Sequence, residues 1–231
     1  MTRGLVPAFA LMLCAFAPQT PPPASTLSSE AQIVLDAWRA KFQAAKDKAA
    51  AMPGSTLAAE LERRIHVEQA GRMAIGDIQA AKLPIDQERL VMAKMGKELS
   101  AGDAANTEWL KSVIPADGWF RNSRDGRQVV GGAWLIVQHS PDRQLQKDVL
   151  AKMAPLVELG EVRGQDYALL YDRTEMAEDR PQRYGSQGTC VNGALTIDRL
   201  EDPEHVDELR AKVGLGPLED YAKILGVGRR C

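Results

Sequence analysis

The stretch VVGGAWLIVQH, residues 129–139, is apolar on almost every side until it reaches Gln138 and His139. A helix that is hydrophobic all round is buried among other elements, because no face of it suits water. We therefore predict a central helix here, around which the rest of the chain packs. Gly131 and Gly132 would let another helix approach closely or would form a tight entry turn.

The segments after this helix are also expected to be helical. Ser140 and Pro141 suit the N-cap and the first position of a helix. Pro155 should kink that helix, because proline lacks the N–H donor of the helical ladder. A further helix is expected over about residues 165–178, and Pro181 prevents its extension.

The first half of the chain also has a helical pattern, with apolar residues at steps of three and four. Pro53-Gly54 should end the first helix, and Ser55 or Thr56 can cap the second. The expected segments are helices over residues 33–52, 57–73, 86–99 and 106–113, followed by a loop over residues 115–127.

Asn192-Gly193 stands between two short apolar runs, which is typical of a β-hairpin. Two more helices are expected after it, opened by Asp202-Pro203 and by Gly216-Pro217. The predicted fold class is therefore mainly α: a single multi-helix domain with a small β-hairpin near residues 188–197.

The composition fits a folded domain that does not bind nucleic acid. The chain has 231 residues, of which 45% are hydrophobic, enough for a sizeable core. Its formal net charge is −2. Nucleic-acid-binding domains usually carry a strong basic excess on one face, so the sequence predicts another kind of partner.

The first two dozen residues match the pattern of an export signal. Arg3 supplies a positive charge, Leu5 to Ala17 is too short to span a bilayer, and its last three residues form a small-x-small cleavage pattern. Cleavage after Ala24 is an alternative. Leu13 is too bulky for a lipoprotein signal at Cys14.

We thus expect an exported protein, periplasmic or secreted, with no stable membrane span once the signal is removed. Residues 1–24 would be the signal peptide with its proline-rich end, residues 25–29 a linker, and residues 30–231 a single helical domain. In an oxidising compartment Cys190 and Cys231 would form a disulfide, which would stabilise the fold by roughly 4 kcal/mol. The alternative is one buried thiol and one free terminal thiol.

His139 is the leading acid–base candidate, because the other imidazoles, His66 and His205, lie among charged residues. The negative end of the helix dipole would stabilise its imidazolium. The alternative is that His139 only caps helix carbonyls. Asp172 could orient His139 and Arg173 could bind an anion, or both could form structural salt bridges.

The segment RPQRYGSQ, residues 180–187, offers amides and a phenol on a loop. Such groups suit an unknown polar small molecule or a peptide-like ligand. The predicted contacts are Gln182, Tyr184 and Gln187 of this segment, together with Gln138. The alternative is that these side chains satisfy backbone groups where helix gives way to hairpin.

Motifs of well-known catalytic sites are absent from the sequence. There is no HExxH pattern, no CxxC pair, no GxSxG, no P-loop and no Rossmann glycine fingerprint. Three histidines spread along the chain are too few to supply the ligands of a typical zinc site. No metal and no cofactor is expected.

Two functions from different classes remain open. One is a hydrolase that acts on an amide, glycan or peptide-like substrate, with His139 as the acid–base group and Asp172 as its orienting partner. The other is a non-catalytic module that binds a ligand or a protein through the same cleft.

Several blocks occur in an order that chance would rarely supply: NTEWLKSVIPADGW, GGAWLIVQH, YALLYDR, RPQRYGSQ and EDPEHVDELRAKVGL followed by PLEDY. With them the chain resembles, over about residues 60–221, a bacterial domain family of unknown function. The resemblance implies signature positions at Trp119, Trp134, Gln138, His139, Gln146, Asp172, Arg173, Gln182, Tyr184, Gly185 and Gln187, with Ser186 in place of the expected threonine. A looser match covers Glu68, Gln69 and Arg72. The resemblance implies no reaction.

Overall fold

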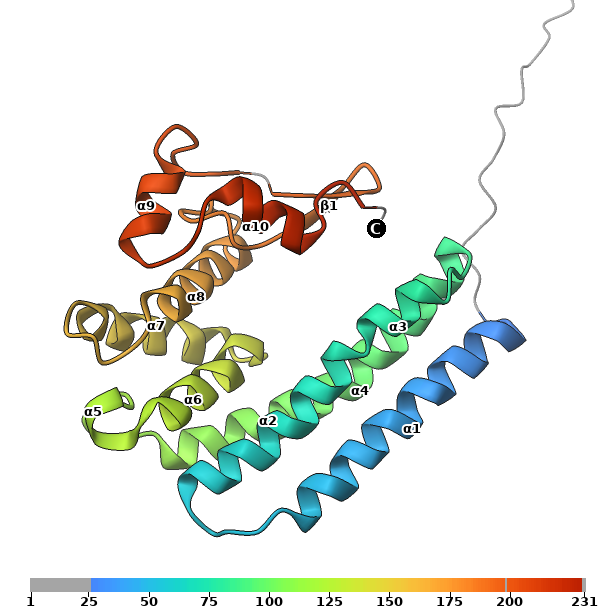
Figure 1. Ribbon diagram of the computed structural model, residues 1–231, viewed down its shortest axis with the longest axis horizontal. Coiled ribbons are helices and arrows are strands. Elements are labelled where there is room, and N and C mark those ends of the chain that lie inside the picture. Colours follow the sequence, from blue (N-terminus) through green and yellow to red (C-terminus); the bar gives the residue numbers. More distant parts are fainter. Residues whose placement is uncertain (1–25, 198, 230–231) are drawn as a thin grey trace, which may run out of the picture.

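The computed structural model describes residues 26–197 and 199–229, and these fold mainly into helices. Figure 1 shows the long first helices running side by side as one arm, with the later elements gathered in a second lobe. The elements of the arm are α1 (Ser29–Ala51), α2 (Leu57–Met73), α3 (Ile75–Ala80) and α4 (Ile85–Val113). The lobe holds α5 (Asn122–Asp125), α6 (Arg127–His139), α7 (Arg143–Glu158), α8 (Gly164–Ala177), β1 (Thr189–Val191), β2 (Ala194–Thr196), α9 (Val206–Lys212) and α10 (Leu218–Leu225). The predicted fold class is confirmed.

The predicted central helix is α6. Its apolar side chains are buried in a core that α2, α4, α7 and α8 also build. Gly132 lies where α2 crosses α6, and a Cβ added there would come within 2.7 Å of Ile65 Cδ1. The glycine therefore permits close approach of two helices, as the sequence predicted.

A second core lies in the arm, between α1, α3 and α4. Trp38 is buried there, stacks on Phe42 with ring centroids 5.0 Å apart, and donates a hydrogen bond to the carbonyl of Gly71. The helix α2 serves both cores, because Leu61 belongs to the first and Val67 packs on the second. It therefore links the arm to the lobe.

Two predictions about helix boundaries were wrong. The expected helices over 86–99 and 106–113 form one helix, α4, which runs through Gly102. Burial of Leu99, Thr107 and Leu110 along one side outweighs the weak helix propensity of glycine. The predicted loop over residues 115–127 also contains the short helix α5.

The N-cap of α7 is Asp142 rather than Ser140. Asp142 accepts a hydrogen bond from the backbone N–H of Leu145 at 2.9 Å. Ser140 instead ends α6 and accepts from the N–H of Asp142. Pro155 lies inside α7, and the kink stays a prediction.

The β-hairpin is confirmed, with β1 and β2 antiparallel. Asn192 and Gly193 have φ angles of 51° and 80°, the left-handed conformation that a two-residue hairpin turn requires. The chain near its end pairs with β2, since Leu195 N donates to the Arg229 carbonyl and Gly228 N donates to the Leu195 carbonyl.

Some predictions fall outside the described residues. The export signal with Cys14 lies there, and so does Cys231 of the predicted disulfide. Among the residues that are described, none of the helices combines the length and the hydrophobicity needed to cross a bilayer.

Candidate functional site

A cleft of about 360 Å³ lies where α2, α6, α8, α10 and the loop before β1 meet. We call it the His139 cleft. It brings Gln138, His139, Arg173 and Gln187 together, four of the seven residues that the sequence singled out for a site. Its lining is Gln69, Arg72, Trp134, Leu135, Gln138, His139, Leu169, Arg173, Ser186, Gln187, Gly188, Tyr221 and Leu225.

His139 is the last residue of α6, and its side chain is 20% exposed. Its Nδ1 forms an ion pair with Oε1 of Glu68, a carboxylate on α2 that is only 3% exposed. The orienting carboxylate of His139 is therefore Glu68. With Nδ1 engaged in this way, Nε2 is the ring nitrogen left for proton exchange.

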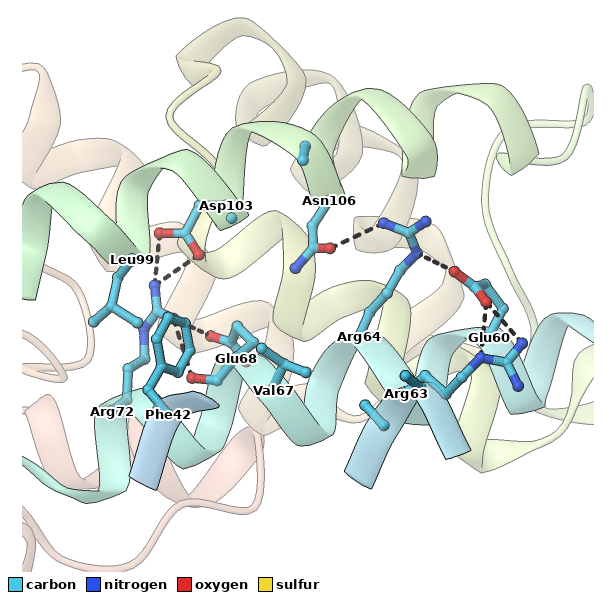
Figure 2. Close-up of a pocket in the computed structure, with 14 residues that line it drawn as sticks. Phe42, Glu60, Arg63, Arg64, Val67, Glu68, Arg72, Leu99, Asp103 and Asn106 are labelled. Atoms are coloured by element: carbon cyan, nitrogen blue, oxygen red, sulfur yellow. Dashed lines mark hydrogen bonds and ion pairs between the residues drawn. The ribbon is translucent and has the colours of Figure 1, made fainter. Parts of the chain in front are cut away.

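Glu68 belongs to a chain of charges that crosses α2 and α4 (Figure 2). Arg72 Nη1 lies 2.7 Å from Glu68 Oε1, and Arg72 Nη2 lies 2.9 and 2.8 Å from the two carboxylate oxygens of Asp103. Gln69 Nε2 donates to Glu68 Oε2 at 2.7 Å. These contacts hold Glu68 rigidly behind the imidazole.

Burial acts to raise the pKa of Glu68, but the neighbouring His139, Gln69 and Arg72 outweigh it and leave this pKa below its usual value. The carboxylate is therefore ionised at neutral pH. A fixed negative charge therefore lies beside Nδ1 of His139.

The stability of the fold should depend on pH through Glu68. Because its pKa in the folded state lies below the usual 4.5, the carboxylate contributes stability above pH 4.5. That contribution is lost as the pH falls through the lower folded-state value. In denaturant titrations, the advantage of the wild type over Glu68→Gln should shrink between about pH 6 and pH 3. A constant difference across this range would contradict the assignment.

Asp172 does not orient His139, which corrects the prediction. The residue is 0% exposed, its Oδ1 accepts from the backbone N–H groups of Arg183 and Tyr184 at 2.8 and 3.0 Å, and its Oδ2 accepts from that of Ser186 at 2.8 Å. Burial raises the pKa of Asp172, and these hydrogen bonds oppose the rise. The carboxylate binds the loop over residues 183–186 to α8.

Gln182 and Tyr184 also support the loop and do not line the cleft, against the prediction of ligand contact. The buried Gln182 side chain donates from Nε2 to the carbonyl of Gln187 at 3.0 Å and accepts at Oε1 from the N–H of the same residue at 2.7 Å. Tyr184 is buried edge-on against Tyr171, with ring centroids 5.9 Å apart. Gln182 thereby positions Gln187 at the cleft.

The carbonyl groups at the end of α6 are satisfied by Gln146. Its Nε2 donates to the carbonyls of Val137, Gln138 and Ser140 at 3.0, 3.4 and 3.1 Å. The capping role that was the alternative for His139 is thus performed by a side chain from α7. His139 is left to its ion pair and to the cleft.

Two polar groups at the cleft lack partners within the described part of the chain. Oε1 of Gln138 is buried and accepts no hydrogen bond, although the residue is only 4% exposed. Nε of Arg173 is buried and donates none. Burial, and then the positive charges of Arg143 and Arg72, lower the pKa of Arg173. Both atoms are buried in residues that line the cleft and have no hydrogen-bond partner among the described residues.

The sequence placed Glu68 and Arg72 only in a loose match to the family and gave no role to them or to Tyr221. All three contribute to the site. Tyr221 on α10 donates from its hydroxyl to the carbonyl of Ser186 at 2.9 Å. The spacing of Glu68 and Arg72, four residues apart on one helix face, was a signal for an ion pair. Nothing local in the sequence relates this pair to His139.

A second cavity, of about 320 Å³, lies on the other side of Arg72 between α1, α2 and α4 (Figure 2). Its wall is largely apolar, and its charged groups pair with one another: Arg63 with Glu60, Arg64 with Glu60 and Asn106, and Arg72 with Glu68 and Asp103. Charged groups that already form ion pairs are less able to bind a polar ligand. The His139 cleft, with its unpaired groups, is the better candidate site.

In the part of the chain that the structure covers, no three of its His, Cys, Asp and Glu side chains gather as a metal site would need. A protein family described as "Family of unknown function (DUF6624)" matches the chain over residues 57–228. The chain belongs to this family. The resemblance to a family of unknown function is confirmed.

The DUF6624 match begins at the first residue of α2 and takes in every residue that lines the His139 cleft. The helix α1 precedes it. No curated protein and no solved structure matches the chain. Neither comparison therefore suggests a ligand.

Proposed function

We propose that this protein is exported and binds a small polar molecule in the His139 cleft. The observation that carries the proposal is Oε1 of Gln138, buried at the cleft without a hydrogen-bond donor from the described residues. Leaving a buried acceptor unsatisfied costs about 1–3 kcal/mol. A ligand that donates a hydrogen bond there would recover that energy.

The position of the cleft supports the same proposal. Its polar groups come from α2, α6, α8, α10 and a loop, elements that are widely separated in sequence. This arrangement is held by a hydrogen bond that Asp172 accepts from Ser186 N–H and by those that Gln182 and Gln146 donate to backbone carbonyls. Sites that bind small molecules are commonly largely preformed and contain a few placed polar groups.

We further propose that the ligand is a substrate for hydrolysis, with His139 as the acid–base group and Glu68 as its positioning residue. His139 would take a proton from water as the water oxygen forms a bond to the carbon under attack. It would then return that proton to the leaving group as the scissile bond breaks. Glu68 would stabilise the imidazolium between these two steps.

The second candidate is a module that binds the ligand and leaves it unchanged. It is favoured by the roles of Asp172, Gln182 and Tyr184, which were expected in the site and instead build its frame. Turnover separates the two candidates. A ligand that binds with His139 and is recovered intact would favour the binding module.

Substituting His139 with alanine should remove ligand binding while leaving the fold intact. In a thermal-shift screen of polar metabolites, a ligand at a hundredfold excess over its Kd adds about 2.7 kcal/mol to the wild-type stability. We expect His139→Ala to lose most of this gain, and His66→Ala to keep it, because His66 lines a different pocket and not the cleft. A ligand that stabilises both variants equally would place the site elsewhere.

The same ligand should then be tested for turnover. If His139 is the acid–base group, His139→Ala should lower kcat/KM for its hydrolysis by about 10²–10⁴. Retention of full activity in this variant would exclude the acid–base role.

The proposal of export is tested separately, on protein expressed from the full-length sequence. We expect an intact mass that corresponds to cleavage after Ala17 or after Ala24. Protein that keeps Met1 to Ala24 and remains inside the cell would overturn the proposal.

A further inference from the structure

We infer that the ligand carries an oxyanion, a carboxylate or a phosphate, and that Arg173 binds it. This inference rests on the proposed binding function and names the chemical class of the ligand. It concerns one guanidinium on α8 that faces the His139 cleft.

The charged residues of the cleft lining favour an anionic ligand. Arg72, Arg173 and His139 contribute positive charge or can do so, and Asp and Glu are absent from the described residues that line it. The remaining polar side chains of the lining are amides and hydroxyls, which are neutral. A cleft with this lining attracts anions and repels cations.

Two of the three cationic groups are already compensated. Arg72 pairs with Glu68 and Asp103, and His139 pairs with Glu68. Arg173 differs, because no ion pair of it is found within the described residues and its Nε is buried without an acceptor. It is the cation of the cleft that still needs a partner.

The carboxylates close to Arg173 in sequence already form hydrogen bonds or ion pairs with other groups. Asp172 precedes Arg173 in sequence, but its oxygens accept from three backbone N–H groups. Glu175 pairs with Arg180, and Glu178 pairs with Arg180 and Lys147. None of these carboxylates is placed to neutralise Arg173.

An uncompensated guanidinium in a partly buried position is costly, because a desolvated charge loses its water without gaining a counter-ion. The lowered pKa of Arg173 agrees with this cost, since burial is its main cause and the charges of Arg143 and Arg72 add to it. A bound oxyanion would remove the cost. Guanidinium groups bind carboxylate and phosphate through two parallel hydrogen bonds.

The same geometry indicates how the ligand would lie. With its oxyanion on Arg173, its neutral part would extend toward Gln138 and His139, which line the same cleft. A volume of about 360 Å³ is near the lower end of small-molecule sites, which span about 300–1,000 Å³. The inferred ligand is therefore a single small anionic molecule.

The test uses the whole mature protein with inorganic phosphate and with acetate as probes, each titrated at constant ionic strength set with sodium chloride. Thermal denaturation is followed for the wild type, for Arg173→Met and for Arg173→Lys. Arg127→Met is the control, because Arg127 is exposed at the other end of α6 and does not line the cleft.

We expect at least one probe to raise the Tm of the wild type and of Arg127→Met, and the apparent Kd to be at least about tenfold weaker in Arg173→Met. Phosphate acting alone would identify a phosphate ligand, and acetate acting alone would identify a carboxylate. Arg173→Lys, which keeps the charge without the planar fork, should respond weakly. It provides the same test should Arg173→Met fail to fold.

Equal responses in the wild type and both Arg173 variants would overturn the inference. So would a neutral ligand that stabilises the protein through His139 while neither probe does, and this result would leave the proposed binding function standing. If neither probe nor any neutral ligand has an effect, the inference and the proposed function both fail.

Discussion

Replacing Asp172 with alanine should lower the free energy of unfolding by about 3–5 kcal/mol, because three backbone N–H groups, two of them buried, would lose their acceptor at once. These groups belong to Arg183, Tyr184 and Ser186, and the carboxylate that they share is fully buried. Such a loss exceeds the cost of most single substitutions. Chemical denaturation of the wild type and the variant measures it directly.

The effect should extend to the ligand. The loop that Asp172 holds leads directly to Ser186 and Gln187 of the cleft. In the folded fraction of the variant, the gain in Tm from a ligand should therefore be smaller than in the wild type. Asp172 would then affect ligand binding without touching the ligand, because it positions the loop that carries cleft residues.

Asp148→Ala is the matched control, because Asp148 is an exposed carboxylate on α7 that accepts a hydrogen bond from Gln144. Its loss should change stability by less than about 0.5 kcal/mol. If Asp172→Ala were as mild as this control, the buried carboxylate would not be holding the loop.

The loop also explains why Gly185 cannot readily be replaced. Its φ angle is 62°, in the left-handed region, and an added Cβ would lie 2.8 Å from Leu218 Cδ1 on α10. The glycine allows the chain to turn beneath Asp172 while α10 packs on it. The RPQRYGSQ block is thus mainly a structural unit that ends in two cleft residues, Ser186 and Gln187.

Much of the fold could be predicted from local patterns. The apolar stretch that ends at His139, the cap at Thr56 and the Asn192-Gly193 turn each depend on neighbours in sequence. The continuous helix α4 could not be predicted, because its middle around Gly102 is stabilised by contacts with distant helices. Tertiary packing decides such segments.

The candidate site was harder to predict for the same reason. His139, Arg173 and Gln187 stand out as polar residues in apolar surroundings, and they do meet at one cleft. The sequence could not show which carboxylate faces His139. Asp172 is next to Arg173 in the chain, but neighbouring residues of a helix point to different sides. Glu68 reaches His139 only because α2 crosses α6.

Replacing Gln146, which supports the end of α6 beside the cleft, should give the second large effect. Its side chain is 1% exposed and donates to three carbonyls at the end of α6. Gln146→Leu keeps most of the volume but removes this donor from all three carbonyls, and in the described part of the chain only that of Val137 keeps a further donor, the backbone N–H of Ser140. We therefore expect a loss of about 2–4 kcal/mol in the free energy of unfolding. Denaturant titration measures the change.

Since Gln138 and His139 lie at this end of α6, the same variant should weaken the ligand-induced gain in Tm as well. Gln144→Ala provides the control, because Gln144 is exposed two positions earlier on α7 and bonds only to Asp148 among the described residues. The control should behave as wild type in both measurements. If Gln146→Leu lost stability but kept full ligand response, the end of α6 would not need this amide to place His139. The cleft would then depend on the loop that Asp172 holds.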